Sequence, residues 1–232
     1  MNLLLAGLAP DERKRLAPFL EPIDVVLNQS LAEQGDQIRF VYFPSNSVTS
    51  IVQTMIDGAS VETGIVGLEG MVGLPLWLHE TTSPVKMFVQ VPGKMMRMKA
   101  SVFVREVRDR ESPLNTAIAR YANAFLTTTG LIAACNRVHH VDARLCRWLL
   151  MVYNRVPGNA FPMRHEYLAY MLGVHRPSVS IAARALKDAS LIDYERGRLQ
   201  VLDAKKLAAG ACECYAVIEK QFEDIYGRKL MR

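Results

Sequence analysis

Cysteine is scarce in this chain of 232 residues: there are four, and none precedes Cys135. So few cysteines exclude a disulfide-stabilised scaffold and are typical of a protein whose thiols stay reduced. Long apolar runs are lacking too. The N-terminal stretch 2–8 is far shorter than the roughly 20 apolar residues of a membrane span and has no basic lead-in like that of a secretory signal. We therefore expect a cytoplasmic protein with no membrane partner.

Catalytic sequence motifs are missing as well. The chain has no phosphate-binding Gly-Lys-Ser/Thr loop, no nucleophile elbow and no zinc-ligand spacing. The glycine-containing stretch 67–70 lies among expected strands and is interpreted as a turn. The sequence thus gives no support for an enzyme.

What the chain does have is a hydrophobic residue content of 50%, which is enough for a buried core, and a net charge of +5. Residues 1–141 carry equal numbers of basic and acidic side chains, so the whole positive surplus lies in residues 142–232. This asymmetry indicates that the C-terminal part meets nucleic acid or another acidic surface, while the N-terminal part does something else.

The N-terminal part predicts a short helix over 9–20 and then a β-domain. Runs rich in β-branched and aromatic residues alternate with turn signals, of which Asp57-Gly58 is a good hairpin turn. The expected strands are 23–27, 40–43, 48–53, 61–66, 85–91 and 94–98. Many short strands at this spacing favour an antiparallel sandwich or barrel, and we predict a β-roll.

Ser112-Pro113 is typical of a helix start, with Ser as the cap and Pro in the first turn. Apolar residues then recur at helical spacing for about six turns. The stripe consists of Leu114, Ile118, Tyr121, Phe125, Ile132 and Cys135. Two interpretations stay open: the helix packs on its own β-domain, or it pairs with the same helix of a second chain. We follow the second and assign the first five residues of the stripe to dimerisation.

The pattern changes again near 138–142, where we place the domain boundary. Asp142 is expected to cap a helix over 143–153, which ends before Pro157-Gly158.

Farther on, a short helix over 164–172 is followed by Gly173 and by a second helix that begins at 175–178, His-Arg-Pro-Ser. Two short helices joined by a glycine-containing turn are typical of a helix-turn-helix, whose second helix enters the major groove of DNA. The stripe that this helix is expected to bury consists of Val179, Ala182, Ala183 and Leu186.

The stretch 191–201 predicts a β-hairpin with the basic tip Arg196-Gly197-Arg198, which suits contact with DNA phosphates. Arginine is the usual bidentate reader of guanine, and serine can serve base edges or phosphates. The expected DNA contacts are His175, Arg176, Ser178, Ser180, Arg184, Arg196 and Arg198.

The stretch 168–180, Leu-Ala-Tyr-Met-Leu-Gly-Val-His-Arg-Pro-Ser-Val-Ser, resembles the winged helix-turn-helix of the cyclic-AMP receptor protein/fumarate-nitrate regulator (Crp/Fnr) family. Upstream, 41–44, 64–67 and 70–74 are similar to the β-roll of that family, and the helix from Ser112 stands where the family has its dimerisation helix. The resemblance covers about 4–203. It implies an α+β fold: a β-roll (a double-stranded β-helix of the cyclic-nucleotide-binding type) over 1–111, a dimerisation helix over 112–138, and a winged helix-turn-helix domain with a C-terminal helix over 139–232.

By the same resemblance, the effector pocket of the family falls on Gly70, Met71, Gly73, Ser83, Pro84 and Lys86. Met71 stands where nucleotide-binding members offer a Glu to the ribose, and Ser83-Pro84 stands where an Arg-Ser pair holds the cyclic phosphate. A cyclic phosphate needs a positive group and N–H donors, and Lys86 is the one nearby residue that could supply the charge. We therefore do not expect control by a cyclic nucleotide.

The recognition helix departs from the family as well. Pro177 and Ile181 stand where many members carry Glu and Arg, while Arg176 is retained. The DNA half-site is therefore expected to differ from the best-known site of the family.

No metal or cofactor is expected. Iron–sulfur members carry an N-terminal cysteine cluster, which this chain lacks. Cys212 and Cys214 are expected to be ordinary thiols that point apart as residues i and i+2 of one helix. His139-His140 could ligate a metal or haem, but histidines at a hinge more often cap a helix or face water.

Together these observations predict a homodimeric, sequence-specific transcription regulator, activator or repressor, that binds a palindromic site in double-stranded DNA. RNA polymerase is a further candidate partner. The alternative is a ligand-binding signalling module that acts through protein contacts and keeps a vestigial helix-turn-helix.

Overall fold

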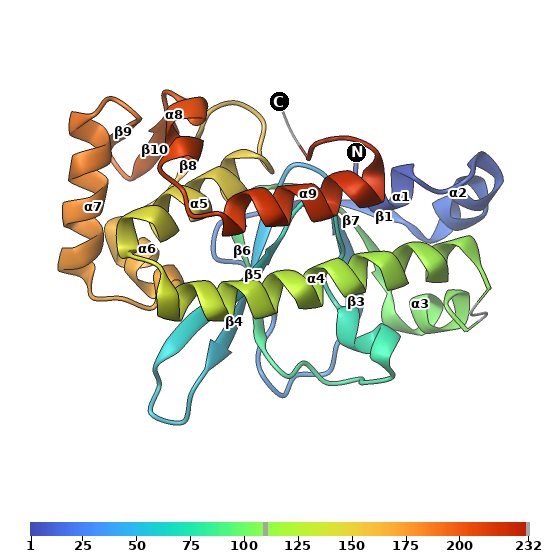
Figure 1. Ribbon diagram of the computed structural model, residues 1–232. Coiled ribbons are helices and arrows are strands. Elements are labelled where there is room, and N and C mark those ends of the chain that lie inside the picture. Colours follow the sequence, from blue (N-terminus) through green and yellow to red (C-terminus); the bar gives the residue numbers. More distant parts are fainter. Residues whose placement is uncertain (109–110, 231–232) are drawn as a thin grey trace.

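The computed structural model describes residues 1–108 and 111–230. A β-domain is crossed by a long helix, and a helical domain with its own small sheet follows at one end (Figure 1). Within the described ranges, no helix has both the length and the apolar character needed to cross a bilayer.

The chain starts with short helical segments: α1 (Leu3–Ala6), α2 (Pro10–Leu16) and the 3-10 turn η1 (Ala17–Phe19). Pro10 and the acidic pair Asp11-Glu12 stand in the first turn of α2, where both are favoured. The helix expected over 9–20 ends earlier, at Leu16, because Pro18 has no N–H with which to continue the α-helical ladder.

The β-domain consists of two antiparallel sheets with the strand orders β1-β7-β3 and β2-β6-β4-β5. The strands are β1 (Glu21–Val25), β2 (Ser30–Ala32), β3 (Phe40–Pro44), β4 (Val48–Thr54), β5 (Ser60–Val66), β6 (Lys86–Val91) and β7 (Gly93–Lys99). Each expected strand is present, and the short β2 is an addition to them. The β-roll is thus confirmed, with a core that includes the buried side chains of Val41, Phe43 and Val52.

The turn at Asp57-Gly58 joins β4 to β5 as expected. Gly58 has φ of +85°, which glycine adopts without strain, and the Asp57 carboxylate accepts a hydrogen bond from the Ala59 N–H at 2.9 Å. The register places Thr54 opposite Ser60, next to the turn. Local turn chemistry therefore fixes the pairing of these two strands.

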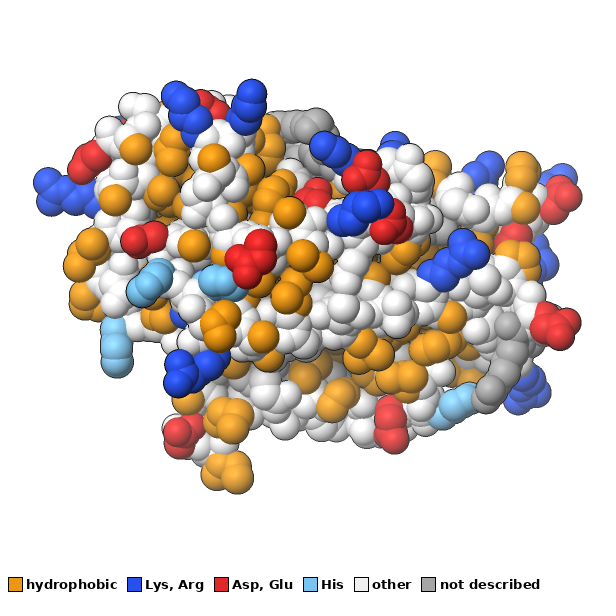
Figure 2. Space-filling view, in the orientation of Figure 1, with side chains coloured by type: hydrophobic (Ala, Val, Ile, Leu, Met, Phe, Trp, Pro, Cys, Tyr) orange, Lys and Arg blue, Asp and Glu red, His pale blue; other side chains and the backbone are white. Residues whose placement is uncertain are grey.

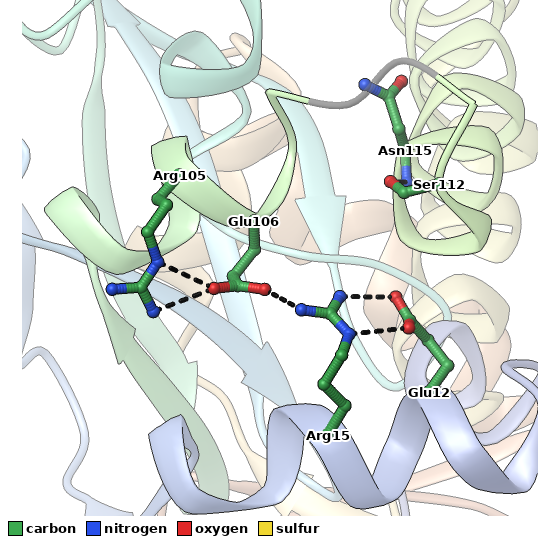
Figure 3. A network of polar contacts seen from close by, with 6 residues as sticks. All are labelled: Glu12, Arg15, Arg105, Glu106, Ser112 and Asn115. Carbon is green, nitrogen blue, oxygen red and sulfur yellow. Dashed lines mark hydrogen bonds and ion pairs between the residues drawn. The ribbon is translucent and has the colours of Figure 1, made fainter.

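Helices α3 (Ala100–Glu106) and α4 (Pro113–Val138) follow, and the Ser112 hydroxyl caps α4 by accepting the Asn115 N–H at 3.1 Å. Figure 3 shows the polar network near this helix start. Arg15 of α2 binds Glu12 and Glu106, and Arg105 binds the other oxygen of Glu106. Although burial raises the pKa of Glu106, hydrogen bonds from the two arginines lower it below its usual value. The network ties α2 to α3.

The apolar stripe of α4 packs inside the chain. Leu114, Ile118, Tyr121 and Ile132 are buried and Phe125 is half-buried, all in contact with the core of the chain. The structure therefore favours the first interpretation of this stripe, and its assignment to a dimer contact is corrected. The pattern indicated that one face of α4 is covered but did not specify what covers it.

The C-terminal domain begins with α5 (Val141–Tyr153). His140, rather than the expected Asp142, is the N-cap residue, and Asp142 lies in the first turn, where its charge favours the helix dipole. The remaining elements are β8 (Ala160–Pro162), α6 (His165–Leu172), α7 (Arg176–Asp188), β9 (Ile192–Glu195), β10 (Arg198–Val201), α8 (Ala204–Ala209) and α9 (Cys214–Tyr226). Helix α9 returns across the molecule and lies beside α4 (Figure 1).

Buried polar contacts join the β-domain to the C-terminal domain. The Glu62 carboxylate of β5 accepts the indole N–H of Trp148 at 2.6 Å, and Glu69 accepts the guanidinium of Arg155 at 2.9 Å. Both acidic side chains are almost fully buried. Because a buried charge or donor left without its partner is costly, these pairs oppose separation of the two domains.

Candidate nucleic-acid interface

Helices α6 and α7 form the expected helix-turn-helix. Gly173 ends α6 with φ of +60°, a conformation that other residues rarely adopt, and the Val174 N–H bonds back to the carbonyl of Ala169. The chain then turns into α7, which starts at Arg176 with Pro177 in its first turn. The predicted buried stripe is confirmed, since the buried residues of this helix are Val179, Ala182, Ala183 and Leu186.

The opposite face of α7 is open to solvent. Of the predicted contact set, Arg176, Ser178 and Arg184 of α7 and its N-cap residue His175 are all exposed. The guanidinium of Arg176 pairs with the Glu166 carboxylate at 2.8 Å, and both side chains are more than half exposed. Figure 2 shows Lys and Arg side chains projecting at the end of the molecule formed by α7 and α8.

Ser180 lies differently from the rest of the predicted set. It is half-buried, and its hydroxyl is 3.2 Å from Nδ1 of His165 on α6. Burial lowers the pKa of His165, which keeps this imidazole neutral. Ser180 thus links the two helices of the motif, so its hydroxyl is not free to point into a groove.

The basic hairpin is present, with a third strand. Strand β10 pairs with β9 and also with β8, which sequence reasoning missed because 160–162 is short and ends in proline. Arg196 and Gly197 both have positive φ, +49° and +77°, as a two-residue turn of the mirror-image type requires. The Arg196 side chain is 90% exposed at the tip.

The tip of the hairpin and the start of α6 meet around a shallow pocket with a volume of about 310 Å³. Arg164, Arg176 and Arg196 line it together with Glu166 and Tyr194. Three arginines around one depression suit contact with an anion such as a phosphate, although the Glu166 carboxylate already pairs with Arg176.

Two residues of this surface were missed by sequence reasoning. Arg164 is the N-cap residue of α6, and its charge directly before the first helix of the motif was the available signal. Ile181 is 71% exposed in the middle of the outer face of α7. Its position two residues after the buried Val179 places it on the opposite side of the helix, and an exposed apolar side chain there suits contact with a thymine methyl group.

The predicted effector pocket is only partly assembled. A cavity of about 320 Å³ between the β-roll and α4 is lined by Met71, Gly73 and Pro84, but not by Gly70, Ser83 or Lys86. Gly70 lies against the Tyr121 ring, where a Cβ would collide with it. The ammonium group of Lys86 pairs with Glu33 at 3.2 Å.

Cys212 and Cys214 do not share a helix. Cys212 precedes α9 and Cys214 is its first residue, so the i and i+2 rule for helices does not apply and their thiols lie close together. The expectation that they point apart is therefore wrong. His139 ends α4 and turns toward them, whereas His140 is exposed.

Comparison with known proteins agrees with this geometry. Residues 143–209 match the sequence pattern of the Crp-like helix-turn-helix domain. A search of curated protein sequences gives no match.

Solved structures of low sequence identity share the fold. A Crp-family transcriptional regulator from Thermus thermophilus has a TM-score of 0.66 at 16% identity, over 90% of this chain and 98% of its own. A c-di-GMP-responsive global regulator from Xanthomonas campestris has a TM-score of 0.65 at 16% identity, over 83% and 99%. A Crp/Fnr-family regulator, also from Thermus thermophilus, has a TM-score of 0.63 at 14% identity, over 82% and 98%. The chain therefore contains a Crp-like helix-turn-helix domain and has the fold of Crp/Fnr-family structures.

Proposed function

We propose that the chain is a homodimeric transcription regulator that binds specific DNA sites in the cytoplasm. In this proposal residues 1–111 sense or relay a signal, 112–138 mediate dimerisation and 139–232 bind DNA. The observation that carries it is the solvent-exposed start of α7 with Arg176, next to the still more exposed Arg196 at the tip of the β9–β10 hairpin, the wing.

In the proposed complex, α7 contacts the bases of the DNA and the wing arginines contact its phosphates. The first turn of α7 would enter the major groove, where Arg176 offers two parallel N–H donors to a guanine and Ile181 meets a thymine methyl. The wing arginines Arg196 and Arg198, with Arg164 beside them, would hold phosphates of the DNA backbone. The position of a half-site is thus set by phosphates and its sequence by α7.

Dimerisation is assigned to the outer face of α4, in place of the buried stripe. This face is exposed and uncharged over its middle turns, where it presents Asn123, Leu126, Thr127, Gly130, Ala133 and Ala134. A Cβ on Gly130 would meet open space, so a second helix can approach closely there.

The β4–β5 hairpin offers a second uncovered surface. Its tip exposes Met55 and Ile56, and Figure 2 shows hydrophobic side chains on this hairpin. Apolar side chains left in water at a hairpin tip are typical of surface that an assembly covers. Two-fold symmetry would then place the two α7 helices about 34 Å apart, which favours a palindromic site.

The cavity beside α4 favours an apolar effector. None of its described lining residues carries a charge, and most are aliphatic or aromatic. Glu69, the acidic residue next to the family's ribose position, is bound to Arg155 and does not line the cavity. A cyclic phosphate would be desolvated there without a cation, so cyclic AMP is not part of the proposed control.

Binding to a labelled random-sequence duplex, measured by fluorescence anisotropy across a salt series, tests the proposal. We expect affinity to fall steeply with salt and to fall further in Arg196→Ala, which removes a phosphate contact that any sequence offers. Arg39→Ala is the matched control, because it removes an exposed arginine from the β-roll and should leave binding unchanged. Absence of salt-dependent binding would favour the alternative, a signalling module with a vestigial helix-turn-helix.

A further inference from the structure

Three of the four cysteines and one histidine meet at a single point of the fold. The Sγ atoms of Cys135, Cys212 and Cys214 and a ring nitrogen of His139 all lie within 4.8 Å of one another. The three thiols are buried, with exposed fractions of 0%, 8% and 2%. Nothing in the proposed DNA-binding function uses these groups.

Two segments far apart in the sequence supply the cluster. Cys135 lies in the last turn of α4, and His139, four residues later, is the C-cap residue whose N–H donates to the Cys135 carbonyl, so both lie at the same end of that helix. Cys212 lies in the connection between α8 and α9, and Cys214 opens α9. The packing of α9 along α4 brings the two pairs together.

Two distances within the cluster are close to those of a tetrahedral metal site. Metal–sulfur bonds of about 2.3 Å in a tetrahedron separate the sulfur atoms by about 3.8 Å, and sulfur from nitrogen by slightly less. The Sγ atoms of Cys135 and Cys212 are 3.5 Å apart, and Cys214 Sγ is 3.7 Å from His139 Nδ1. These two distances, with every other pair of ligand atoms within 4.8 Å, are compatible with four ligands around one metal ion.

The surroundings suit a bound cation. The second ring nitrogen of His139, Nε2, lies 3.1 Å from the Glu213 carboxylate, which fixes the imidazole so that Nδ1 faces the thiols. A metal-bound histidine usually has a carboxylate or carbonyl partner of this kind. Leu131 and Ala143 pack against the three cysteines and give the cluster an apolar wall.

One end of a helix dipole lies at the cluster. Cys214 is the first residue of α9, where the positive end of the dipole favours a negatively charged ligand. A divalent cation would offset the charge of three thiolates held this close together.

We propose that Cys135, His139, Cys212 and Cys214 bind one structural Zn²⁺ ion. Three thiols and an imidazole are a closed, four-ligand set for zinc, with no position left for a substrate. On binding, each thiol releases its proton to solvent and its sulfur donates a lone pair to the metal, while His139 coordinates through neutral Nδ1. The ion would clamp the end of α4, next to the domain boundary, to the start of α9.

The direct test is the metal content of the full chain purified with a non-thiol reductant, measured by mass spectrometry. We expect about one zinc per chain. Replacement of zinc by Co²⁺ is expected to give the thiolate charge-transfer band and the intense visible bands of a tetrahedral sulfur site. A reduced chain that binds neither ion, or one that holds iron instead, would overturn the proposal.

Ligand variants locate the site. Cys212→Ala and His139→Ala should lose the zinc and the cobalt spectrum, while Glu213→Gln should weaken binding by about 10–100-fold. His139→Cys keeps four ligands and should keep the metal, which separates loss of a ligand from loss of the fold. Cys146→Ala is the matched control, because Cys146 is a buried cysteine outside the cluster and its removal should leave one zinc bound. Equal metal content in Cys212→Ala, His139→Ala and Cys146→Ala would refute the assignment.

Discussion

The guanidinium of Arg176 has the Glu166 carboxylate as its partner, on the helix that precedes α7. An exposed ion pair of this kind contributes only about 0–1 kcal/mol to stability, because water screens both charges. Exchange of Glu166 for the edge of a guanine therefore costs little. Without DNA, the guanidinium of Arg176 stays beside the Glu166 carboxylate, at 2.8 Å.

Arg176→Ala is expected to weaken binding to the specific site by about 1–3 kcal/mol, because a bidentate contact to one guanine is lost. The free energy of unfolding should change by less than about 1 kcal/mol, since the pair with Glu166 is exposed. Titration of the cognate duplex by fluorescence anisotropy, with Arg39→Ala as control, measures the first quantity. Unchanged affinity for the cognate site would remove Arg176 from the base contacts.

Glu62 is the residue that makes folding depend on pH near neutrality. Burial raises its pKa to about 7, although the hydroxyl of Ser50 and the indole of Trp148 both donate to its carboxylate and act in the opposite direction. A carboxyl group with a raised pKa in the folded state favours folding most when it is protonated in both states. The stabilisation that Glu62 gives the folded state is therefore complete below the ordinary pKa of 4.5 and is lost as the pH rises through 7.

We accordingly expect the free energy of unfolding of the wild type to fall between pH 5 and 8 by about 1–3 kcal/mol relative to Glu62→Gln. The amide keeps an acceptor for Trp148 but cannot ionise. Urea denaturation of both chains across this range measures the difference. Parallel pH profiles would show that Glu62 does not titrate in this range.

Among the elements, the wing (the β9–β10 hairpin) is the one whose variants test contact with DNA phosphates most directly. Its tight turn at Arg196-Gly197 leaves the Arg196 side chain almost fully in solvent, beyond the edge of the three-stranded sheet. A positive charge held there by the backbone can meet the phosphate backbone of any sequence. The wing should thus supply affinity, and α7 should supply sequence discrimination.

Arg196→Ala should lower the slope of log affinity against log salt by about 1, with the same loss for specific and random duplexes. Salt titrations of both duplexes measure it, and Arg39→Ala should leave both slopes intact. A change in base preference would contradict the assignment of the wing to phosphates.

Elements with strong local signals could be predicted from sequence, and those that depend on tertiary contacts could not. Asp57-Gly58, Ser112-Pro113 and Gly173 each fix a turn or a helix end through their own backbone preferences, and the structure has all three where expected. The strand β8 carries little signal of its own and forms because β10 pairs with it. The cluster of Cys135 with Cys212 joins positions 77 residues apart, a contact that neither segment encodes locally.

At the scale of the whole molecule, the fold leaves one long helix face uncovered. The inner stripe of α4 fills the core of the chain, while its outer face stays open from Asn123 to Ala134. The sequence could not distinguish these two roles, because a single apolar stripe indicates burial but not the identity of the partner. The proposed dimer would use the outer face and leave the core unchanged.

Leu126→Glu should convert the dimer into a monomer, because it would place two carboxylates at the centre of the contact between the two α4 helices. Leu126 is 62% exposed in the single chain, so folding should be nearly unaffected. Sedimentation equilibrium measures the mass. Val26→Glu, at an exposed apolar residue of the β-roll, is the matched control and should remain dimeric. A dimer of undiminished stability in Leu126→Glu would place the contact elsewhere.

Selection of bound duplexes from a random pool tests the central claim most directly, since it asks at once for sequence specificity and for two-fold symmetry. We predict an enriched palindrome whose half-site centres lie about one DNA turn, or a multiple of it, apart. With Arg176→Ala, preference should relax at one symmetric pair of positions and persist at the others. A pool that shows no enrichment over its input, or an enriched site without symmetry, would contradict a dimeric sequence-specific regulator.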